Sequence, residues 1–433
     1  MLVYTPQITN RIRYIFQTIF EDVWSTPFEL TEDVDFFQNH SGPKLNYSMR
    51  KLGDELFVES HDLLREKGIS DQEIQLTHWE ELPVFFQTSS YSSLPFDVFA
   101  ASFYLLSRYE EYLPHIRDHY ERFMAKESLA FQYGFLQKPL VNLWLQKFQK
   151  VIQQKYPDFM PAGSEFKFIS TIDIDNAYCY LEKGVARTIG AFARSIWNGD
   201  KEAVKERWEV LRKKQSDPYD TFELQLALQQ KYDLEVVYFV LLADYGLNDK
   251  NIPFQSRKFQ LLIKHLADHA KVGIHPSFGS NYEEGRLKEE WKRLKNIIKR
   301  EVSISRQHFL KLSFPTTYRN LIDLGIQNDY TMGYAAYPGF RASICHPFYF
   351  YDLELEQSTS LRVHPFVVMD ATFKYYLDFT PEQALSLTKE LMQEVKKVNG
   401  TFVTLWHNET WSEHGAWKGW SQLYEEIIKL AKA

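Results

Sequence analysis

The stretch Phe166-Lys-Phe-Ile-Ser-Thr-Ile-Asp-Ile-Asp-Asn176 leads from an apolar, β-branched segment straight into two carboxylates, Asp173 and Asp175. A short apolar run of this kind is typical of a buried strand in a parallel sheet. Polar side chains at the carboxyl end of such a strand face the ligand crevice of an α/β fold. Because the two acids are two residues apart, an extended strand directs both to one face. They suit a metal or general-base site, and an Asx-type turn or a helix N-cap is the structural alternative.

The composition places the chain in the globular class and argues against several partners. Its 433 residues favour two domains, and 44% hydrophobic with 25% charged residues is typical of a globular protein. The net charge of −7 gives no reason to expect nucleic acid or an anionic membrane as partner. The two cysteines form no disulfide framework, which indicates a reducing compartment. With no signal core and no apolar stretch of about 20 residues, we expect a cytoplasmic protein without a transmembrane segment; the oligomeric state stays open.

Two parts of the chain differ in their pattern. Residues 1–160 predict a smaller α/β domain with an aromatic-rich helix over Phe96–Tyr112. Pro157–Ser164 is a suitable boundary because it contains Pro161 and Gly163. Residues 165–433 repeat a strand-then-helix pattern, with strands expected at Phe166–Ile172, Val236–Leu242, Val272–Ile274, Ile304–Leu312, Phe366–Met369 and Phe402–Trp406. Six such units suit a (β/α) barrel of parallel strands better than an open sheet.

Acids or histidines close four of these predicted strands. They are Asp173 with Asp175, His275, Asp370 and His407. Each has a structural explanation alone, and a buried structural histidine is the alternative for His275, but together they indicate an active site. Asp and His ligands with an open position suit Zn²⁺ or a similar divalent ion that activates water. A free carboxylate and a protonated histidine add a base and an acid, so the residue types predict metal-assisted amide hydrolysis.

Residues 165–433 resemble the polysaccharide deacetylase family, also called carbohydrate esterase family 4. The resemblance implies a deformed (β/α)7 barrel that removes N- or O-acetyl groups from sugars with a divalent metal. It implies that Asp173 is the base and Asp175 a metal ligand, although Ile174 separates two acids that are usually adjacent. It also implies that His275 is a ligand.

Three further residues are similar to motifs of the same family. Arg341 in Gly-Phe-Arg resembles the arginine that orients the base. Asp370 resembles the acid of the fourth motif. His407 in Leu-Trp-His resembles the general-acid histidine. We therefore expect Asp173, Arg341, Asp370 and His407 to act in catalysis.

The second family motif is incomplete in this chain. Gly279 stands four residues after His275, where the family has its second histidine. His308 in Arg-Gln-His-Phe is the candidate replacement ligand. The alternatives are a metal held by Asp175, His275 and water, or a site that no longer binds metal.

The resemblance implies an acylated carbohydrate as substrate and, as first hypothesis, a hydrolase that deacetylates an amino sugar in a glycan or its precursor. One alternative is an inactive deacetylase-like protein that binds carbohydrate, and another is a hydrolase of a carbon–nitrogen bond in a small amide. Residues 1–160 resemble an uncharacterised domain that precedes such deacetylase-like domains in some bacterial proteins. It could serve as a scaffold, a lid or an oligomer contact.

Overall fold

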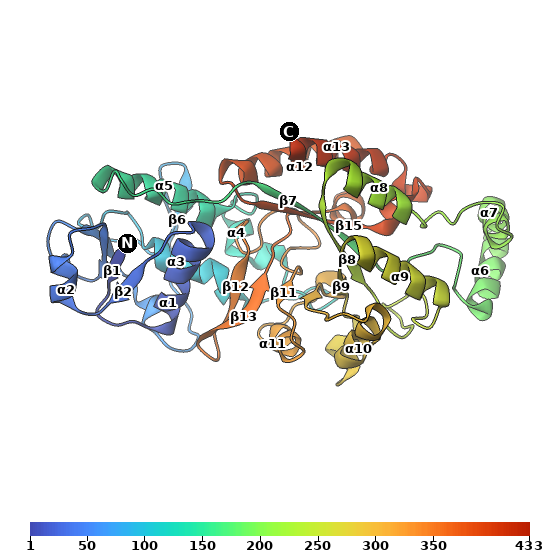
Figure 1. The fold of residues 1–433 in the computed structure, drawn as a ribbon, viewed down its shortest axis with the longest axis horizontal. Helices are drawn as coiled ribbons and strands as arrows, with labels where there is room; N and C mark the ends of the chain where they lie inside the picture. The colour runs from blue at the N-terminus through green and yellow to red at the C-terminus, as the bar shows by residue number, and fades with distance from the viewer.

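The structure of the protein, a computed structural model, describes all 433 residues, with the N-terminal part at one end (Figure 1). This part contains a four-stranded parallel sheet in the order β2-β1-β3-β4 and a separate hairpin, β5-β6. The strands are β1 Leu2–Tyr4, β2 Glu29–Thr31, β3 Lys44–Ser48, β4 Leu56–Glu59, β5 Thr77–Trp79 and β6 Leu82–Val84. The helices are α1 Asn10–Gln17, α2 Val34–Asn39, α3 Val98–Leu106, α4 Leu129–Gln132 and α5 Leu140–Lys155. The arrangement is mixed α/β, as predicted.

The helix predicted over Phe96–Tyr112 is shorter than expected. Asp97 caps α3, because its Oδ1 accepts hydrogen bonds from the backbone N–H groups of Phe99 and Ala100 at 2.9 and 3.0 Å. All nine residues of α3 are buried, so its apolar run forms core on every side. The helix ends before Arg108, whose φ of 55° is left-handed and cannot continue an α-helix.

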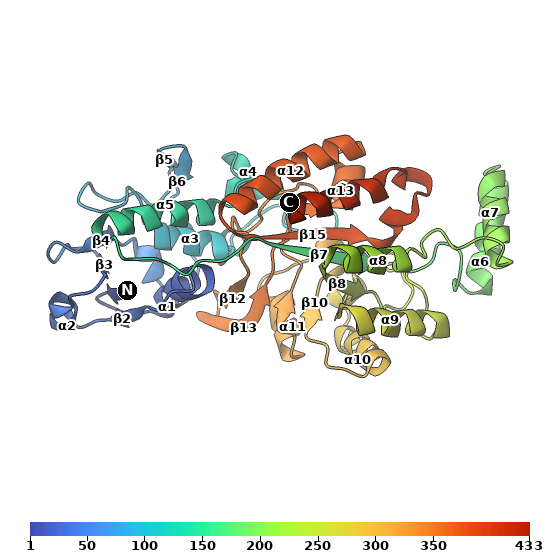
Figure 2. The same ribbon diagram turned by 45° about the horizontal axis from the view of Figure 1, so that its top comes forward.

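The C-terminal part is built on a nine-stranded sheet in the order β12-β13-β11-β10-β9-β8-β7-β15-β14 (Figure 2). The strands are β7 Lys167–Ile174, β8 Glu235–Val240, β9 Lys271–Ile274, β10 Ile304–Ser305, β11 Asn328–Asp329, β12 Phe348–Asp352, β13 Gln357–Val363, β14 Val368–Met369 and β15 Thr401–His407. Only β12 is antiparallel to its neighbour.

In Figure 1, helices α12 and α13 lie above this curved sheet and α9 and α10 below it. Side chains of all four helices belong to the large buried cluster that also contains Ile172, Tyr238 and Ile274 of the strands, so these helices cover the same, outer face of the sheet. The helices of this part are α6 Val185–Trp197, α7 Lys201–Leu211, α8 Phe222–Tyr232, α9 Arg257–His269, α10 Arg286–Ile298, α11 Thr316–Asp323, α12 Pro381–Lys397 and α13 Trp420–Lys432. No helix in the chain combines the length and the apolar character needed to cross a bilayer.

The parallel α/β architecture predicted for residues 165–433 is confirmed, but the predicted (β/α)7 barrel is not. The sheet is open, because its edge strands β12 and β14 each pair with one neighbour only. Pairing is short at β10, β11 and β14, which have two residues each. One face is nevertheless concave, since side chains from distant strands meet in one buried cluster: Ile169, Val237, Phe239, Leu310, Tyr330, Ala335, Phe366, Met369, Val403 and Leu405.

Three strands, β9, β7 and β15, bring predicted site residues to one end of the sheet. β7 pairs in parallel with β15, and Asp173 lies opposite His407. On the other side β7 pairs with β8, and β8 pairs with β9, which ends at Ile274 directly before His275. Because the carboxyl ends of parallel strands meet at one edge, these side chains converge there.

Buried contacts join the two parts of the chain. Arg341 Nη2 of the C-terminal part lies 2.6 Å from Glu111 Oε2 of the N-terminal part, and both side chains are buried. A single buried apolar cluster also contains side chains of both parts. The two sheets are separate in their hydrogen bonding, and the domain boundary at Pro157–Ser164 stays a prediction.

Candidate metal and catalytic site

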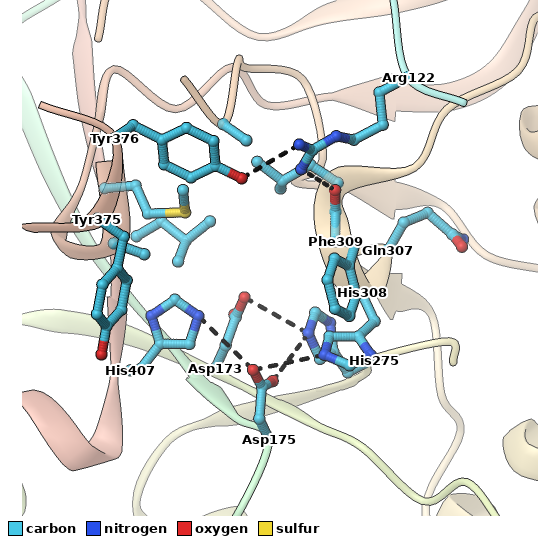
Figure 3. Close-up of a pocket in the computed structure, with 15 residues that line it drawn as sticks. Arg122, Asp173, Asp175, His275, Gln307, His308, Phe309, Tyr375, Tyr376 and His407 are labelled. Atoms are coloured by element: carbon cyan, nitrogen blue, oxygen red, sulfur yellow. Dashed lines mark hydrogen bonds and ion pairs between the residues drawn. The ribbon is translucent and has the colours of Figure 1, made fainter. Parts of the chain in front are cut away.

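Five of the seven predicted site residues line one cavity of about 270 Å³ (Figure 3). They are Asp173, Asp175, His275, His308 and His407. Asp370 lies behind His407, and Arg341 lies outside the cavity lining. The volume is slightly below the range of about 300–1,000 Å³ that is typical of ligand sites.

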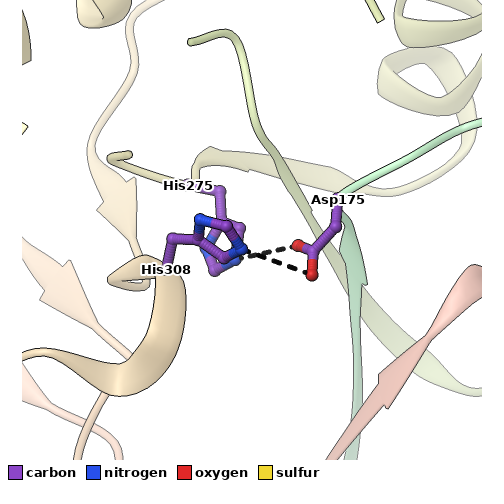
Figure 4. A group of neighbouring side chains, drawn as sticks. All are labelled: Asp175, His275 and His308. Carbon is purple, nitrogen blue, oxygen red and sulfur yellow. Dashed lines mark ion pairs between the residues drawn. The ribbon is translucent and has the colours of Figure 1, made fainter. Parts of the chain in front are cut away.

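Asp175, His275 and His308 form a group suited to hold a metal ion (Figure 4). One ligand atom from each lies within 4.8 Å of the others. Asp175 Oδ1 is 3.2 Å from His275 Nε2, and its Oδ2 is 3.5 Å from His308 Nε2. Asp175 Oδ1 is buried and has no hydrogen-bond partner. A carboxylate with two imidazoles is a ligand set for Zn²⁺ and similar divalent ions, so these residues fit the predicted cofactor without distinguishing the metal.

Both imidazoles are oriented through their Nδ1 atoms. His275 Nδ1 lies 2.6 Å from the backbone oxygen of Arg306, which can only accept, so Nδ1 carries the proton. His308 Nδ1 lies 2.8 Å from Asp249 Oδ1. With the Nδ1 protons engaged in this way, each Nε2 can offer a lone pair toward Asp175.

His308 reaches the site because the strand predicted over Ile304–Leu312 is much shorter. Strand β10 covers only Ile304–Ser305, and the chain then turns through Phe309 with a φ of 58°. The imidazole of His308 therefore lies at the carboxyl end of β10, beside that of His275, with 5.1 Å between ring centroids.

Asp249, in the loop after β8, was not predicted as a site residue. Besides His308 Nδ1, its carboxylate accepts the backbone N–H groups of Phe278 and Gly279 at 2.8 and 3.1 Å. Gly279 thus supports the site through its backbone and not as a ligand. The only sequence signal for Asp249 is an acid in a polar loop after a predicted strand, which is too common to single it out.

Replacing Asp249 by Asn is expected to weaken metal affinity by about 10–100-fold, the usual effect of losing a group that orients a ligand. The amide removes the negative charge behind His308 while keeping the shape of the side chain. Chelator competition would measure the affinity. Asp244→Asn is the matched control, since Asp244 is in the same loop and its exposed carboxylate pairs only with Arg293 at 2.9 Å. Equal affinities of the Asp249 variant and the wild type would contradict the assignment.

Asp173 is held by Arg306, which the sequence does not predict as a site residue. Arg306 Nη1 donates to Asp173 Oδ1 at 2.9 Å, and both side chains are buried. Asp173 Oδ2 lies 3.6 Å from His275 Nε2 and faces the cavity. Arg306 therefore fixes Oδ1 of Asp173, and Oδ2 is free to accept a proton from a molecule in the cavity.

Arg341, expected to orient Asp173, has a different role in the structure. Its Nε and Nη2 donate to the two carboxylate oxygens of Glu111 at 3.0 and 2.6 Å. Its Nη1 donates to the backbone oxygen of Gly333 at 3.0 Å. Because this buried side chain is occupied by Glu111 from the N-terminal part, it joins the two parts, and the arginine at Asp173 is Arg306.

Asp370 holds His407 from behind. His407 Nδ1 lies 2.7 Å from Asp370 Oδ1, and Asp370 Oδ2 accepts the backbone N–H of His407 at 2.8 Å and the hydroxyl of Thr410. Burial disfavours the charged imidazole, but the Asp370 carboxylate outweighs it and raises the pKa of His407 well above its usual value, with help from Asp175 and Asp173. His407 Nε2 faces the cavity, 3.8 Å from Asp175 Oδ2.

The carboxylates around the cavity favour positive charge on the histidines of the site. Burial lowers the pKa of His308, but Asp175 and Asp249 outweigh this effect and raise it to about 9. For Asp175, burial acts against ionisation, yet the neighbouring histidines hold its pKa well below the usual value. A metal ion can supply the same positive charge that a proton supplies to these histidines.

The N-terminal part contributes one residue, Arg122, to the lining of the cavity. Arg122 Nη1 donates to the backbone oxygen of Phe309 at 2.9 Å, and Nη2 donates to the hydroxyl of Tyr376 at 3.2 Å (Figure 3). Asp118 holds the same guanidinium at 2.7 Å. Residues of both parts of the chain therefore line the cavity.

Comparisons with known proteins support the predicted resemblance. A family model described as "Family of unknown function (DUF7033)" matches residues 1–157. A putative polysaccharide deacetylase from Mycobacterium smegmatis is 13% identical, with a TM-score of 0.41 over 64% of this chain and 86% of that one. The polysaccharide deacetylase Bc1974 from Bacillus cereus is 12% identical, with a TM-score of 0.29 over 61% and 87%. A mutant of BA3943, a CE4 family pseudoenzyme with restored enzymatic activity, is 12% identical, with a TM-score of 0.27 over 62% and 69%.

No curated protein matches the chain. The resemblance to polysaccharide deacetylases predicted from the sequence is confirmed by the solved structures. All of the TM-scores above are below 0.5, so these matches say nothing about the function of this chain.

Proposed function

We propose that the protein is a metal-dependent hydrolase that removes an N-acetyl or O-acetyl group from an amino sugar in a glycan or glycan precursor. One observation carries the proposal. A metal-ligand group, a carboxylate fixed by an arginine and a histidine fixed by an aspartate line the same cavity. Metal-assisted amide hydrolysis uses all three of these features, whereas a purely structural role has no use for the combination.

Asp173 is the proposed general base. Arg306 donates to Oδ1, which leaves Oδ2 to take a proton from the attacking water. Asp173 and His407 lie opposite each other on the paired strands β7 and β15. A substrate between them would have the base and the acid on different sides of its carbonyl group.

His407 is the proposed general acid. The Asp370 carboxylate holds its Nδ1 proton and favours the charged imidazole, so that Nε2 carries a proton to give to the leaving nitrogen. Asp370 thus acts through His407 and does not touch the substrate.

A divalent ion held by Asp175, His275 and His308 would supply Lewis-acid chemistry, polarising the acyl carbonyl and increasing the acidity of water. The position of His308 supports a working site, because the histidine that Gly279 replaces in the family pattern has a spatial substitute. This weakens the case for an inactive carbohydrate-binding protein.

We also propose that residues 1–160 and 165–433 are separate domains and that the curved sheet is an opened form of the (β/α)7 barrel. Separate hydrogen-bonded sheets and the match of a family model to residues 1–157 support the division. The buried cluster on the concave face supports the relation to a barrel.

Metal removal provides the test of this function. We expect the wild type to release acetate from N-acetylglucosamine oligomers, to lose this activity after treatment with a chelator, and to regain it when Zn²⁺ is added. Enzymatic quantification of acetate gives the readout. No acetate release from any acylated glycan, together with measurable glycan binding, would replace the hydrolase with the inactive binding protein.

A further inference from the structure

The α6–α7 hairpin, residues 185–211, carries an apolar surface that no other part of the chain covers. Four large apolar side chains of α6 are between 62% and 90% exposed: Val185, Ile189, Ile196 and Trp197. Helix α6 has no buried residue at all. The hairpin projects at the end of the molecule opposite the N-terminal sheet (Figures 1 and 2). Exposed apolar surface of this extent is typical of an interaction site.

Helix α6 presents its polar face to the protein and its apolar face to the outside. Val185, Ile189 and Ile196 are spaced by four and seven residues and form one stripe. Arg187 lies on the opposite face, where it donates to the backbone oxygens of Lys250 and Asn251 at 3.0 and 3.1 Å. A surface helix normally buries its apolar stripe, so the orientation of α6 is reversed.

Polar contacts fix the hairpin in this orientation. Asp217, which follows α7, accepts the backbone N–H groups of Cys179 and Tyr180 at 2.7 and 2.8 Å, and so ties the entry of the hairpin to its exit. Tyr180 donates its hydroxyl to Glu206 of α7 at 2.7 Å. The apolar stripe contributes nothing to this attachment and is available to a partner.

The charge of the hairpin differs from that of the whole chain. Residues 185–214 contain eight Lys or Arg and four Asp or Glu, a net charge of +4, whereas the chain carries −7. Arg212, Lys213 and Lys214 are exposed directly after α7, and the Arg212 guanidinium is 4.3 Å from the ring centroid of Trp208. A second copy docking through the same surface would bring like charges together. The surface complements an anionic partner instead.

We propose that the α6–α7 hairpin binds the surface of an anionic lipid bilayer. An exposed apolar stripe with a tryptophan at its end, on a hairpin that also carries exposed basic side chains, is the pattern of helices that lie in the bilayer interface. The stripe enters the headgroup region, and the basic residues at 212–214 contact lipid phosphates. The hairpin begins ten residues after Asp175, at the carboxyl end of β7, and so lies at the same end of the sheet as the cavity. The inference does not depend on the proposed function.

Sedimentation of the full-length protein with vesicles tests this inference. Vesicles in which about one third of the lipid is phosphatidylglycerol and the rest is phosphatidylcholine are compared with vesicles of phosphatidylcholine alone. We expect binding to the anionic vesicles only, and weaker binding in about 1 M salt, where the Debye length falls to about 3 Å. Ile189→Ser with Ile196→Ser should weaken binding about tenfold or more for each isoleucine.

Two further variants keep the test decisive. Lys213→Glu with Lys214→Glu leaves the apolar stripe intact and should weaken binding to anionic vesicles about tenfold or more. This variant tests the proposal by itself if circular dichroism shows that the isoleucine variant does not fold. Tyr91→Ser is the control, because Tyr91 is 79% exposed in the N-terminal part and should not affect binding.

Three results would overturn the proposal. The first is no binding to anionic vesicles, and the second is equal binding to both vesicle types. The third is a lipid-free dimer of the wild type that the isoleucine variant converts to a monomer in sedimentation velocity, because the stripe would then be a contact between copies of the chain.

Discussion

Replacing Asp173 by Asn is expected to lower turnover by about 10²–10⁴-fold, the usual contribution of a general base. Asn has nearly the same shape but cannot accept the proton at Oδ2. The metal should be retained, because Asp173 does not belong to the group formed by Asp175, His275 and His308. The effect should therefore appear in kcat with an unchanged metal content.

The measurement is the rate of acetate release together with elemental analysis of the same sample. Asp329→Asn is the matched control, since Asp329 is a fully buried aspartate of strand β11 in the same sheet. Its carboxylate bonds Ser305 and Thr331, outside the cavity lining. Full activity of the Asp173 variant on an acetylated amino sugar would show that the base is another group.

Replacing His308 by Ala is expected to remove the metal, with a loss of affinity above the roughly 10–100-fold that changes behind a ligand cause. One of three protein ligands disappears, and Asp249 loses the imidazole that it orients. Activity should fall with metal content, and added Zn²⁺ should restore little of it.

His364→Ala controls for the loss of a buried imidazole. His364 is as buried as His308, but its Nε2 lies 2.8 Å from Asn328 Oδ1, outside the cavity. This control should keep the metal. An unchanged metal content in the His308 variant would favour the reading in which Asp175, His275 and water hold the ion.

Five of the seven site residues predicted from the sequence line one cavity in the structure, and their roles stay predictions. β7, β9 and β15 each end beside a residue chosen from the sequence, because buried apolar strands are visible as short hydrophobic runs and parallel strands share one functional edge. The sequence also predicts His308 as a ligand, although the strand predicted over Ile304–Leu312 is longer than the observed strand β10. The turn at Phe309, which places it, has no signature in a single sequence.

The error over the arginine has a physical cause. Arg306 and Arg341 are both buried and both have a carboxylate partner. The partner of Arg341, Glu111, is 230 residues away in the chain, and no local pattern reveals such a contact. Arg306 directly follows β10 and could have been selected by the same strand-end rule as His275.

Strands β11 and β13 and the exposed stripe on α6 could not be predicted, because the sequence pattern of a strand or helix does not say what its apolar face packs against. β11 has two polar residues, and β13 begins Gln-Ser-Thr-Ser, so neither has the apolar run of a core strand. The stripe on α6 is amphipathic in the sequence, which normally indicates packing, and only the fold shows that it faces outward. The net charge of −7 likewise concealed the local excess of basic residues in the hairpin.

The central claim is that Asp175, His275 and His308 hold a divalent metal ion. Crystals of the protein grown with Zn²⁺, with diffraction recorded at the zinc absorption edge, test it most directly. We predict an anomalous peak about 2.0–2.2 Å from a carboxylate oxygen of Asp175 and from Nε2 of both histidines. A peak bound to other residues, or none between these three side chains at saturating Zn²⁺, would contradict the account.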